Sequence, residues 1–412
     1  MKKFALILLS MAALSGFAGG FQLNLQSVRA IGLGGAYTGF AYGPSSVFFN
    51  PGGMSQVKGH QLMAGINLVF PKVSLQTEMT DNINQTSGLS TPFHFYYSGE
   101  IIKDKLYAGL AINNLFGSSS SFEENWEGRF IVQNIGLKTF SFQPTFNYKL
   151  HERLSIGAGF VLTSGSFSFE KAVPLGSSSS DYGKASLSGS GLAYGFNVGL
   201  FSNLIETDQL KLTLGASYRS RQKISLDNGV ANFSDIPVSL QGTFPEETAF
   251  SSALNLPAVF TAGFSVKYDL KEDHSLLFVY DFNYTSWSSY DTLAFDFANA
   301  DTPDSKTTKA WENSPTFRFG LEYAFQEMLY LRVGGYYDIT PIQDGFVSPE
   351  LPDANQFVPT AGVGILLNDK IGFDVSWIHQ DSKRTADLTD AGFSASYRRI
   401  ADVISFSASF KF

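Results

Sequence analysis

The side chains that most often carry catalysis are few and scattered in this chain. No Ser/His/acid grouping and no metal-ligand spacing connects the histidines. They are His60, His94, His151, His274 and His379. Cysteine is absent, which removes thiol catalysis, thiolate metal sites and disulfides. We therefore expect no enzyme, no bound metal and no cofactor.

A glycine cluster, Gly32-Leu33-Gly34-Gly35, superficially suggests a nucleotide-binding loop. A dinucleotide fingerprint also needs a preceding strand, a following helix and a downstream acid, and none is present. We interpret these glycines as positions of tight turns and close backbone approach. Acidic residues (37) outnumber Lys and Arg (29), which argues against nucleic acid as a partner.

The N-terminus has the order of a secretory signal. Lys2 and Lys3 precede an apolar stretch from Phe4 to Leu14, and the small-residue site Gly16-Phe17-Ala18 follows. The apolar stretch is shorter than the about 20 residues of a membrane-spanning helix, and no later segment is longer. We expect residues 1–18 to be removed on export, and we exclude a helical membrane protein.

From about residue 60 onward, apolar and polar residues alternate with period two. The segment 136–151 shows the pattern best. One face carries Phe140, Phe142, Phe146, Tyr148 and Leu150, and the other carries Ser141, Gln143, Thr145, Asn147 and Lys149. Such segments are long enough for the about 9–11 residues with which a tilted strand crosses hydrocarbon. The pattern predicts strands with one lipid-facing side and one polar side.

Fourteen segments carry this alternation. They lie at 60–79, 91–102, 105–117, 136–151, 152–170, 186–203, 210–226, 254–269, 275–297, 311–325, 328–339, 356–368, 370–383 and 397–412. Short turns alternate with long loops, as in an outer-membrane barrel. We predict an all-β fold in which residues 60–412 form a 14-stranded antiparallel transmembrane β-barrel in a bacterial outer membrane. A soluble β-sandwich or a secreted β-helix is the alternative, and the alternating gap lengths weigh against both.

Residues 19–59 do not alternate and are rich in Gly and small residues. A barrel of this strand number encloses more space than side chains alone can fill, and an open bore would leak. We therefore predict that residues 19–59 form an N-terminal plug, or hatch, inside the lumen.

Several sequence blocks carry a resemblance to a known family. The opening GFQLNLQSVRAIGLGGAYTG…SSVFFNPGGM looks like the hatch of the FadL-type outer-membrane transporters, and Asn50-Pro51-Gly52 resembles that family's Asn-Pro-Ala signature. Because the third position differs, we expect a looser backbone there. Further matching blocks are Phe116-Gly117, Trp126-Glu127-Gly128-Arg129, Leu256-Pro257-Ala258, Trp287-Ser288, Arg318-Phe319-Gly320, LRVGGYYDITP at 331–341 and LPDANQF at 351–357. They follow the family order over nearly the whole mature chain.

The resemblance implies passive transport of hydrophobic compounds such as long-chain fatty acids or aromatic hydrocarbons. Capture by outer loops, a lumenal pocket at the hatch and lateral release into the membrane are implied as well. The C-terminal Phe412 resembles the signal that the barrel-assembly machinery reads. We expect a monomer surrounded by outer-membrane lipid and lipopolysaccharide. A general polar-solute porin is the alternative function.

In the third strand the alternation of lipid-facing and lumen-facing residues is interrupted. Residues 106–113 alternate cleanly, and then Asn114 falls on the lipid face and Leu115 on the inner face. Bulges of this kind interrupt pairing and are common at functional sites. The resemblance places a lateral opening at the same strand, and the competing interpretation is the start of an outer loop. The predicted border consists of Gly109, Asn113, Asn114, Phe116 and Gly117.

Two further groups of residues are candidates for substrate binding. The longest predicted loop, 227–253, is more apolar than a solvated loop requires, and loop-on-loop packing is its alternative explanation. Its candidates are Phe233, Ile236, Val238, Phe244 and Phe250. Arg318 and Arg332 would face the lumen with Glu322, where an arginine could pair with a carboxylate ligand. Alternatively, these charges bind each other or hold the hatch.

Overall fold

The computed structural model describes residues 19–86, 88–176, 181–270 and 273–412, so the predicted signal sequence 1–18 lies outside the described residues. One antiparallel sheet dominates the fold. Its first strand, β1 (His60–Gln76), pairs with both β3 (Phe93–Ile102) and the last strand, β20 (Phe393–Lys411), which closes the sheet into a barrel. The predicted all-β barrel of 14 antiparallel strands is confirmed.

Several barrel strands are built from two consecutive segments. After β1 and β3, the strands in chain order are β4 (Leu106–Asn113) with β5 (Gly117–Ser121), β6 (Asn134–His151), β7 (Leu154–Pro174), β8 (Tyr182–Glu206), β9 (Leu210–Arg219) with β10 (Gln222–Ser234), β11 (Glu247–Leu256) with β12 (Val259–Asp269), β13 (His274–Thr285) with β14 (Thr292–Phe297), β15 (Ser305–Thr308) with β16 (Ser314–Phe325), β17 (Leu329–Asp338), β18 (Gln356–Leu367), β19 (Ile371–Leu388) and β20.

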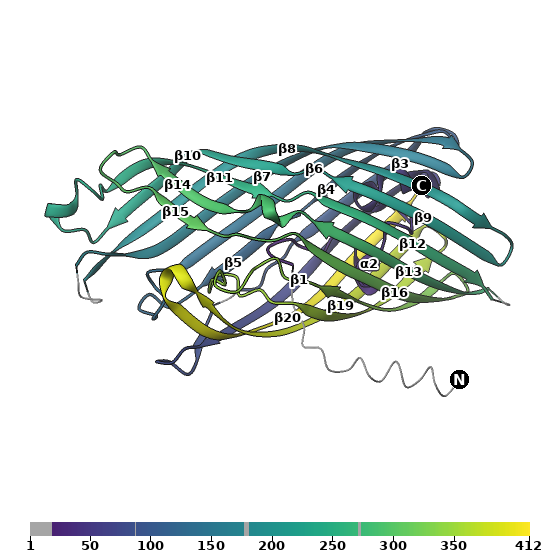
Figure 1. The fold of residues 1–412 in the computed structure, drawn as a ribbon. Helices are drawn as coiled ribbons and strands as arrows, with labels where there is room; N and C mark the ends of the chain where they lie inside the picture. The colour runs from purple at the N-terminus through teal and green to yellow at the C-terminus, as the bar shows by residue number, and fades with distance from the viewer. Residues whose placement is uncertain (1–18, 87, 177–180, 271–272) are drawn as a thin grey trace.

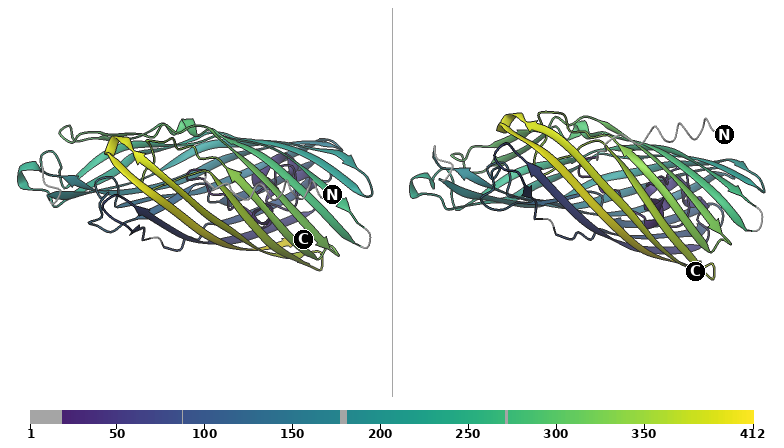
Figure 2. Two further views of the ribbon diagram at one scale, coloured as in Figure 1. Left: turned by 60° about the horizontal axis from the view of Figure 1, so that its bottom comes forward. Right: turned by 90° about the horizontal axis from the view of Figure 1, so that it is seen from below.

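The remaining elements are short. They are β2 (Ile83–Asn84), α2 (Val28–Gly32), α3 (Ser46–Phe49), η1 (Pro51–Gln56), η2 (Val238–Leu240), η3 (Trp287–Ser289) and η4 (Thr389–Ala391). Figure 1 shows the tilted strands around a lumen, with α2 inside it. Figure 2 shows the same barrel from two further sides, with the chain's C-terminus at the end where the strands turn tightly. No helix in the described part of the chain is long and apolar enough to cross a membrane.

The strand β6 has the two-sided character that its sequence predicts. Its Phe and Tyr side chains point outward and stay exposed, with Phe146 at 62%. Gln143 and Asn147 on the other face are buried in the lumen at 1–2% exposure. Exposed aromatics on the outer wall are stable in lipid, whereas the inner polar groups need hydrogen-bond partners inside the barrel.

Farther along the strands this polarity inverts. In β7, Ile156 and Phe160 face outward, but toward the loop end the outward positions become serines, as at Ser166. On the inner face of that same part, Phe167 is buried. An apolar outer wall suits lipid and a polar outer wall suits water, so the strands extend beyond the hydrocarbon layer.

The inner faces of these extensions form a buried apolar cluster, which we call the outer aromatic cluster. It includes Phe21, Leu115, Phe116, Phe122, Trp126, Phe167, Phe233, Phe250, Trp287, Tyr290, Phe295 and Trp311. Residues from the N-terminal segment, several strands and the outer loops therefore share one apolar core above the membrane-spanning part.

Strand boundaries differ from the predictions at this outer end. The predicted loop 384–396 is mostly paired, because β19 and β20 continue to Leu388↔Phe393. The predicted loop 227–253 shrinks to 235–246, and the predicted strand 275–297 is interrupted at residues 286–291. In the extended parts of β7, β11 and β20, Phe167, Phe250 and Phe393 face inward. The alternation that marks lipid-facing strands therefore does not identify these extensions.

Candidate functional site

Residues 19–59, hereafter the N-terminal segment, contact the inner wall of the barrel. The Asn50 amide nitrogen donates to the Thr38 carbonyl (2.9 Å) and to the Leu200 carbonyl (3.0 Å), and its oxygen accepts from the Gly52 amide (2.9 Å). The Asn147 side chain of β6 donates to the carbonyls of Pro51 and Gly52, both at 2.8 Å. Asn50-Pro51-Gly52 thus anchors the segment to two parts of the wall.

The backbone at Gly52 is held rather than loose. Besides the bond to Asn147, its carbonyl accepts from the Ser155 hydroxyl at 2.7 Å. A Cβ atom added to Gly52 would lie 2.8 Å from the Leu200 carbonyl carbon. Glycine at this position therefore permits close contact with the strand β8.

The third barrel strand is interrupted between Asn113 and Gly117. Asn113 pairs with Ser141, and Gly117 pairs with Lys138, so three residues of the third strand face two of β6. On the other side, pairing with β3 ends at His94↔Asn113. The parity break in the sequence therefore coincides with a one-residue bulge and with the end of pairing to β3.

Beyond this point the N-terminal segment replaces β3 as the partner of the third strand. The Leu23 amide donates to the Leu115 carbonyl (2.9 Å), and the Gly117 amide donates to the Phe21 carbonyl (3.0 Å). Gln22 and Phe116 form the bridge between these bonds. A gap in the wall ladder is thus occupied by a segment that is not part of the barrel.

The predicted border residues divide into two groups. Asn113, Asn114, Phe116 and Gly117 meet at the interruption, where the Asn114 side chain donates to the Thr139 carbonyl at 2.7 Å. Gly109 lies earlier in β4, and a Cβ there would be 2.5 Å from a methyl group of Val47. Gly109 therefore permits close packing of the N-terminal segment rather than bordering the interruption.

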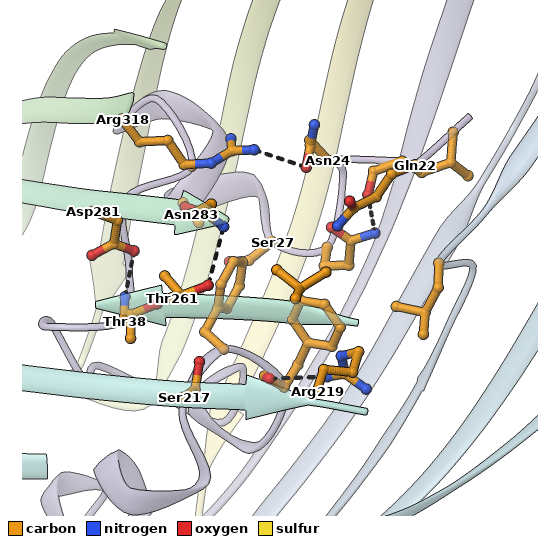
Figure 3. A pocket seen from close by; sticks show the side chains of 18 of the residues that line it. Gln22, Asn24, Ser27, Thr38, Ser217, Arg219, Thr261, Asp281, Asn283 and Arg318 are labelled. Atoms are coloured by element: carbon orange, nitrogen blue, oxygen red, sulfur yellow. Dashed lines mark hydrogen bonds between the residues drawn. The ribbon is translucent and has the colours of Figure 1, made fainter. Parts of the chain in front are cut away.

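A cavity of about 70 Å³ lies between the N-terminal segment and the wall. Leu115, Phe116 and Phe48 give it an apolar side toward the outer aromatic cluster. Figure 3 shows polar side chains from β9, β12, β13 and β16 converging on it, among them Arg219 and Arg318. The space holds a few waters and is too small for a long acyl chain.

Arg219 is the cavity residue that sequence reasoning missed. Its guanidinium donates to Gln143 Oε1 (2.9 Å) and to the Phe48 carbonyl (3.2 Å), and it lies 4.5 Å from the Phe48 ring centroid. Within the described ranges, no carboxylate lies at ion-pair distance from it. Arg219 is therefore a cation without a counter-charge at the edge of a partly apolar space.

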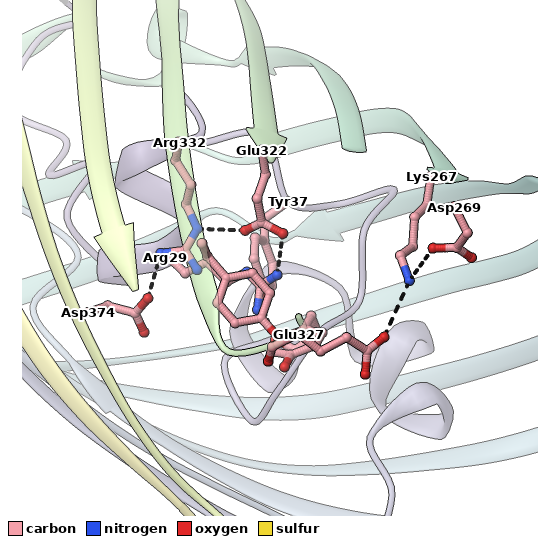
Figure 4. A network of polar contacts seen from close by, with 10 residues as sticks. Arg29, Tyr37, Lys267, Asp269, Glu322, Glu327, Arg332 and Asp374 are labelled. Carbon is pink, nitrogen blue, oxygen red and sulfur yellow. Dashed lines mark hydrogen bonds and ion pairs between the residues drawn. The ribbon is translucent and has the colours of Figure 1, made fainter. Parts of the chain in front are cut away.

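The two arginines that sequence reasoning selected are engaged differently. Arg332 binds Glu322 (2.6 Å) and Asp374, and Arg29 of α2 binds the other oxygen of Glu322 (2.6 Å), as Figure 4 shows. Arg318 lines the cavity but donates to Asn24 Oδ1 (2.9 Å) and to the Gly34 carbonyl (3.3 Å). Both side chains thus have partners in the N-terminal segment or in the network that holds it.

The predicted outer-loop candidates are spread over the outer end of the barrel. Phe233 and Phe250 lie in β10 and β11 and are buried in the outer aromatic cluster, where Phe250 packs 5.4 Å from the Phe295 ring. Phe244 packs on Phe233 with ring centroids 5.3 Å apart. Val238 of η2 is 84% exposed. The group therefore combines buried packing residues with one exposed apolar tip.

The described residues contain no group of three or more His, Cys, Asp or Glu side chains that could hold a metal ion. The candidate site consists of hydrogen-bonding, cationic and aromatic groups around the cavity of about 70 Å³. Such groups can bind and position an amphipathic solute. The closed sheet and its lipid-facing band define a transmembrane β-barrel.

A family model described as outer membrane protein transport protein (OMPP1/FadL/TodX) matches residues 9–412, and the chain belongs to this family. The predicted family and the outer-membrane location are thereby confirmed. The family is one of transport proteins rather than enzymes.

Among its relatives, the long-chain fatty acid transport protein of Salmonella typhi is 26% identical over 403 residues, covering 89% of this chain and 88% of the relative. The protein of that name in Escherichia coli (strain K12) is 24% identical over 413 residues, covering 89% of each. A Pseudomonas aeruginosa FadL homologue has a TM-score of 0.80 at 18% identity, covering 96% of this chain and 100% of that one. The P. putida toluene transporter TodX has a TM-score of 0.69 at 15% identity, covering 97% and 99%. These solved structures share the fold.

Proposed function

We propose that this protein is a passive conduit for hydrophobic compounds and that acidic amphiphiles such as long-chain fatty acids fit it best. The observation that carries the proposal is Arg219, a cation without a carboxylate partner beside the apolar side of the cavity. A fatty-acid carboxylate would supply the missing counter-charge, and its chain would enter the outer aromatic cluster. The names of the Salmonella and Escherichia relatives agree with this substrate class.

Neutral aromatic hydrocarbons form the second substrate class. The TodX neighbour is titled a toluene transporter. A neutral ring would use the aromatic cluster and would leave Arg219 unpaired. The uncompensated cation therefore favours an acid. A general polar porin is disfavoured because the N-terminal segment lies inside the lumen, hydrogen-bonded to β6, β7 and β8 of the wall.

In the proposed path, the exposed tip at Val238 and the surrounding loops capture the solute, which then passes the outer aromatic cluster to the cavity. The N-terminal segment acts as the hatch. Release occurs laterally where residues 21–23 now pair with residues 115–117, because displacing this short pairing opens a gap without breaking a continuous strand. The solute thereby reaches the membrane without crossing an aqueous pore.

The remaining partners also belong to the proposal. Outer-membrane lipid and lipopolysaccharide would surround the apolar band, and the barrel-assembly machinery would read the last strand with its C-terminal Phe412. We expect the protein to act as a monomer, because the closed sheet completes its own pairing.

The test is equilibrium binding of a labelled long-chain fatty acid to the purified protein. Loss of a charge-assisted hydrogen bond costs about 1.5–3 kcal/mol, so Arg219→Met should weaken binding about 10- to 150-fold. Arg221→Met, two residues away and exposed, is the matched control and should bind normally. Binding of toluene should change little in both variants. Equal fatty-acid affinity in Arg219→Met and the control would contradict the assigned role.

A further inference from the structure

The first residues of the N-terminal segment lie against two buried carboxylates. The Gly20 amide donates to Asp353 Oδ2 at 3.1 Å, and the Gly19 amide donates to Asp338. A Cβ atom added to Gly19 would lie 2.8 Å from Asp338 Oδ2. The chain therefore begins its path in the barrel in direct contact with both acids.

Two tryptophan rings complete the enclosure. Gly20 adopts a φ of +66°, and a Cβ there would lie 2.8 Å from an atom of Trp287 and 2.8 Å from an atom of Trp311. The two rings are 5.0 Å apart in an edge-to-face arrangement. Only glycine fits, both because of the positive φ and because no side-chain volume is left. The site therefore accommodates backbone atoms and no side chain at position 20.

Within the described residues, neither acid has a cation at hydrogen-bond distance, and each accepts a hydroxyl hydrogen bond, Asp338 from Thr316 (2.6 Å) and Asp353 from Thr340 (2.7 Å). Asp338 is 3% exposed and Asp353 is fully buried, and Asp353 Oδ1 accepts no hydrogen bond in the described part of the chain. Arg399 approaches this oxygen only to 3.9 Å. Arg318, the other cation near Asp338, directs its hydrogen bonds to Asn24 and to the N-terminal backbone. Buried carboxylates are costly without a cation that also donates hydrogen bonds.

Export would supply such a cation. Cleavage after Ala18, at the small-residue end of the signal sequence, makes Gly19 the first residue and converts its amide into an α-ammonium. An α-amino group is mostly protonated near neutral pH and donates three hydrogen bonds. Burial raises the pKa of Asp353 to about 7. An adjacent α-ammonium would favour the ionised carboxylate and so oppose this rise.

We propose that Asp338 and Asp353 form a receptor for the α-ammonium of the processed chain, with Trp287 and Trp311 enclosing the adjacent Gly20. Signal removal thereby creates the group that fixes residues 19–20. It also fixes the adjacent residues 21–23, which pair with the third strand at its interruption. Removal of the signal is thus a step in building the closed barrel, in addition to releasing the protein from export. This inference does not depend on which solute the barrel conducts.

The experiment measures the reactivity of the Gly19 α-amine in the purified mature protein. Reductive methylation at pH 7 is followed by mass spectrometry of the N-terminal peptide, and the same sample after unfolding gives the reference rate. Because only the neutral amine reacts, each unit by which the site raises the α-amine pKa slows labelling about tenfold. We expect labelling at least about tenfold slower in the folded protein. Asp338→Asn with Asp353→Asn should restore the reference rate.

The control is Asp344→Asn, an outer carboxylate with 90% of its side chain exposed, which should keep the slow rate. If the double variant does not fold, one Ala inserted between Ala18 and Gly19 tests the same point with both acids intact. It displaces the charge by one residue and should abolish the protection. A mature N-terminus other than Gly19 overturns the proposal. So does labelling at the reference rate in the folded wild-type protein, or protection unchanged by removal of the acids.

Discussion

Asn50 is the side chain whose removal should release the N-terminal segment most selectively. Its amide takes part in three hydrogen bonds, with Thr38, Leu200 and Gly52, at 2.9–3.0 Å. Each such bond contributes about 0.5–1.5 kcal/mol, so Asn50→Ala should weaken the docking of the segment by about 1.5–4.5 kcal/mol. Since about 1.4 kcal/mol corresponds to a factor of ten, the released population should rise about 10- to 1,600-fold.

Amide hydrogen exchange measures this population directly. Peptides covering residues 46–57 should exchange faster by the same factor in Asn50→Ala, whereas peptides from β6 and β7 should exchange as in the wild type. Asn82→Ala, at an exposed loop position, is the control and should change neither. Unchanged exchange in residues 46–57 would refute the anchoring role. Acceleration throughout the barrel would show instead that Asn50 stabilises the whole fold.

Four further predictions concern the exit, the outer aromatic cluster, the exposed tip and the charge network. Gln22→Cys with Phe116→Cys should form a disulfide, because this non-hydrogen-bonded pair places its Cα atoms about 4.5 Å apart; the oxidised protein should lose fatty-acid uptake and recover it on reduction, and uptake in the oxidised form would exclude this exit. Phe250→Ala should destabilise the protein by about 3–5 kcal/mol in thermal unfolding, while Val238→Asp should slow solute capture without a change in stability. Arg332→Ala should cost about 3–5 kcal/mol and leave fatty-acid affinity unchanged in the folded fraction, and weaker affinity would instead make Arg332 a ligand.

The membrane-spanning part of the fold was predictable because its apolar residues face lipid and its polar residues face the lumen. Phe142 and Phe146 face lipid while Gln143 and Asn147 face the lumen, and the sequence records this directly as period-two alternation. Beyond the membrane the apolar residues face the inside of the barrel and the polar residues face water. Phe393 and Leu388 turn inward to the outer aromatic cluster, so the same alternation has the opposite meaning there.

The candidate site was only partly predictable, because it depends on register between strands. Arg332 stands directly opposite Glu322 in the adjacent strand and is neutralised by it. Arg219 stands opposite Asn197 on one side and Val259 on the other, so it has no acid to pair with. Sequence alone shows lumen-facing arginines in both cases. The parity break at Asn114 was visible in the sequence, but its pairing with residues 21–23 was not, because that contact joins distant segments.

We expect the barrel to conduct hydrophobic solutes and to exclude polar ones. Proteoliposomes containing the purified protein test it when uptake of a labelled long-chain fatty acid and swelling in small sugars are measured on the same preparation. We predict protein-dependent fatty-acid uptake and sugar permeation close to that of protein-free liposomes. Rapid swelling in sugars together with no increase in fatty-acid uptake would contradict the account and identify an open polar pore.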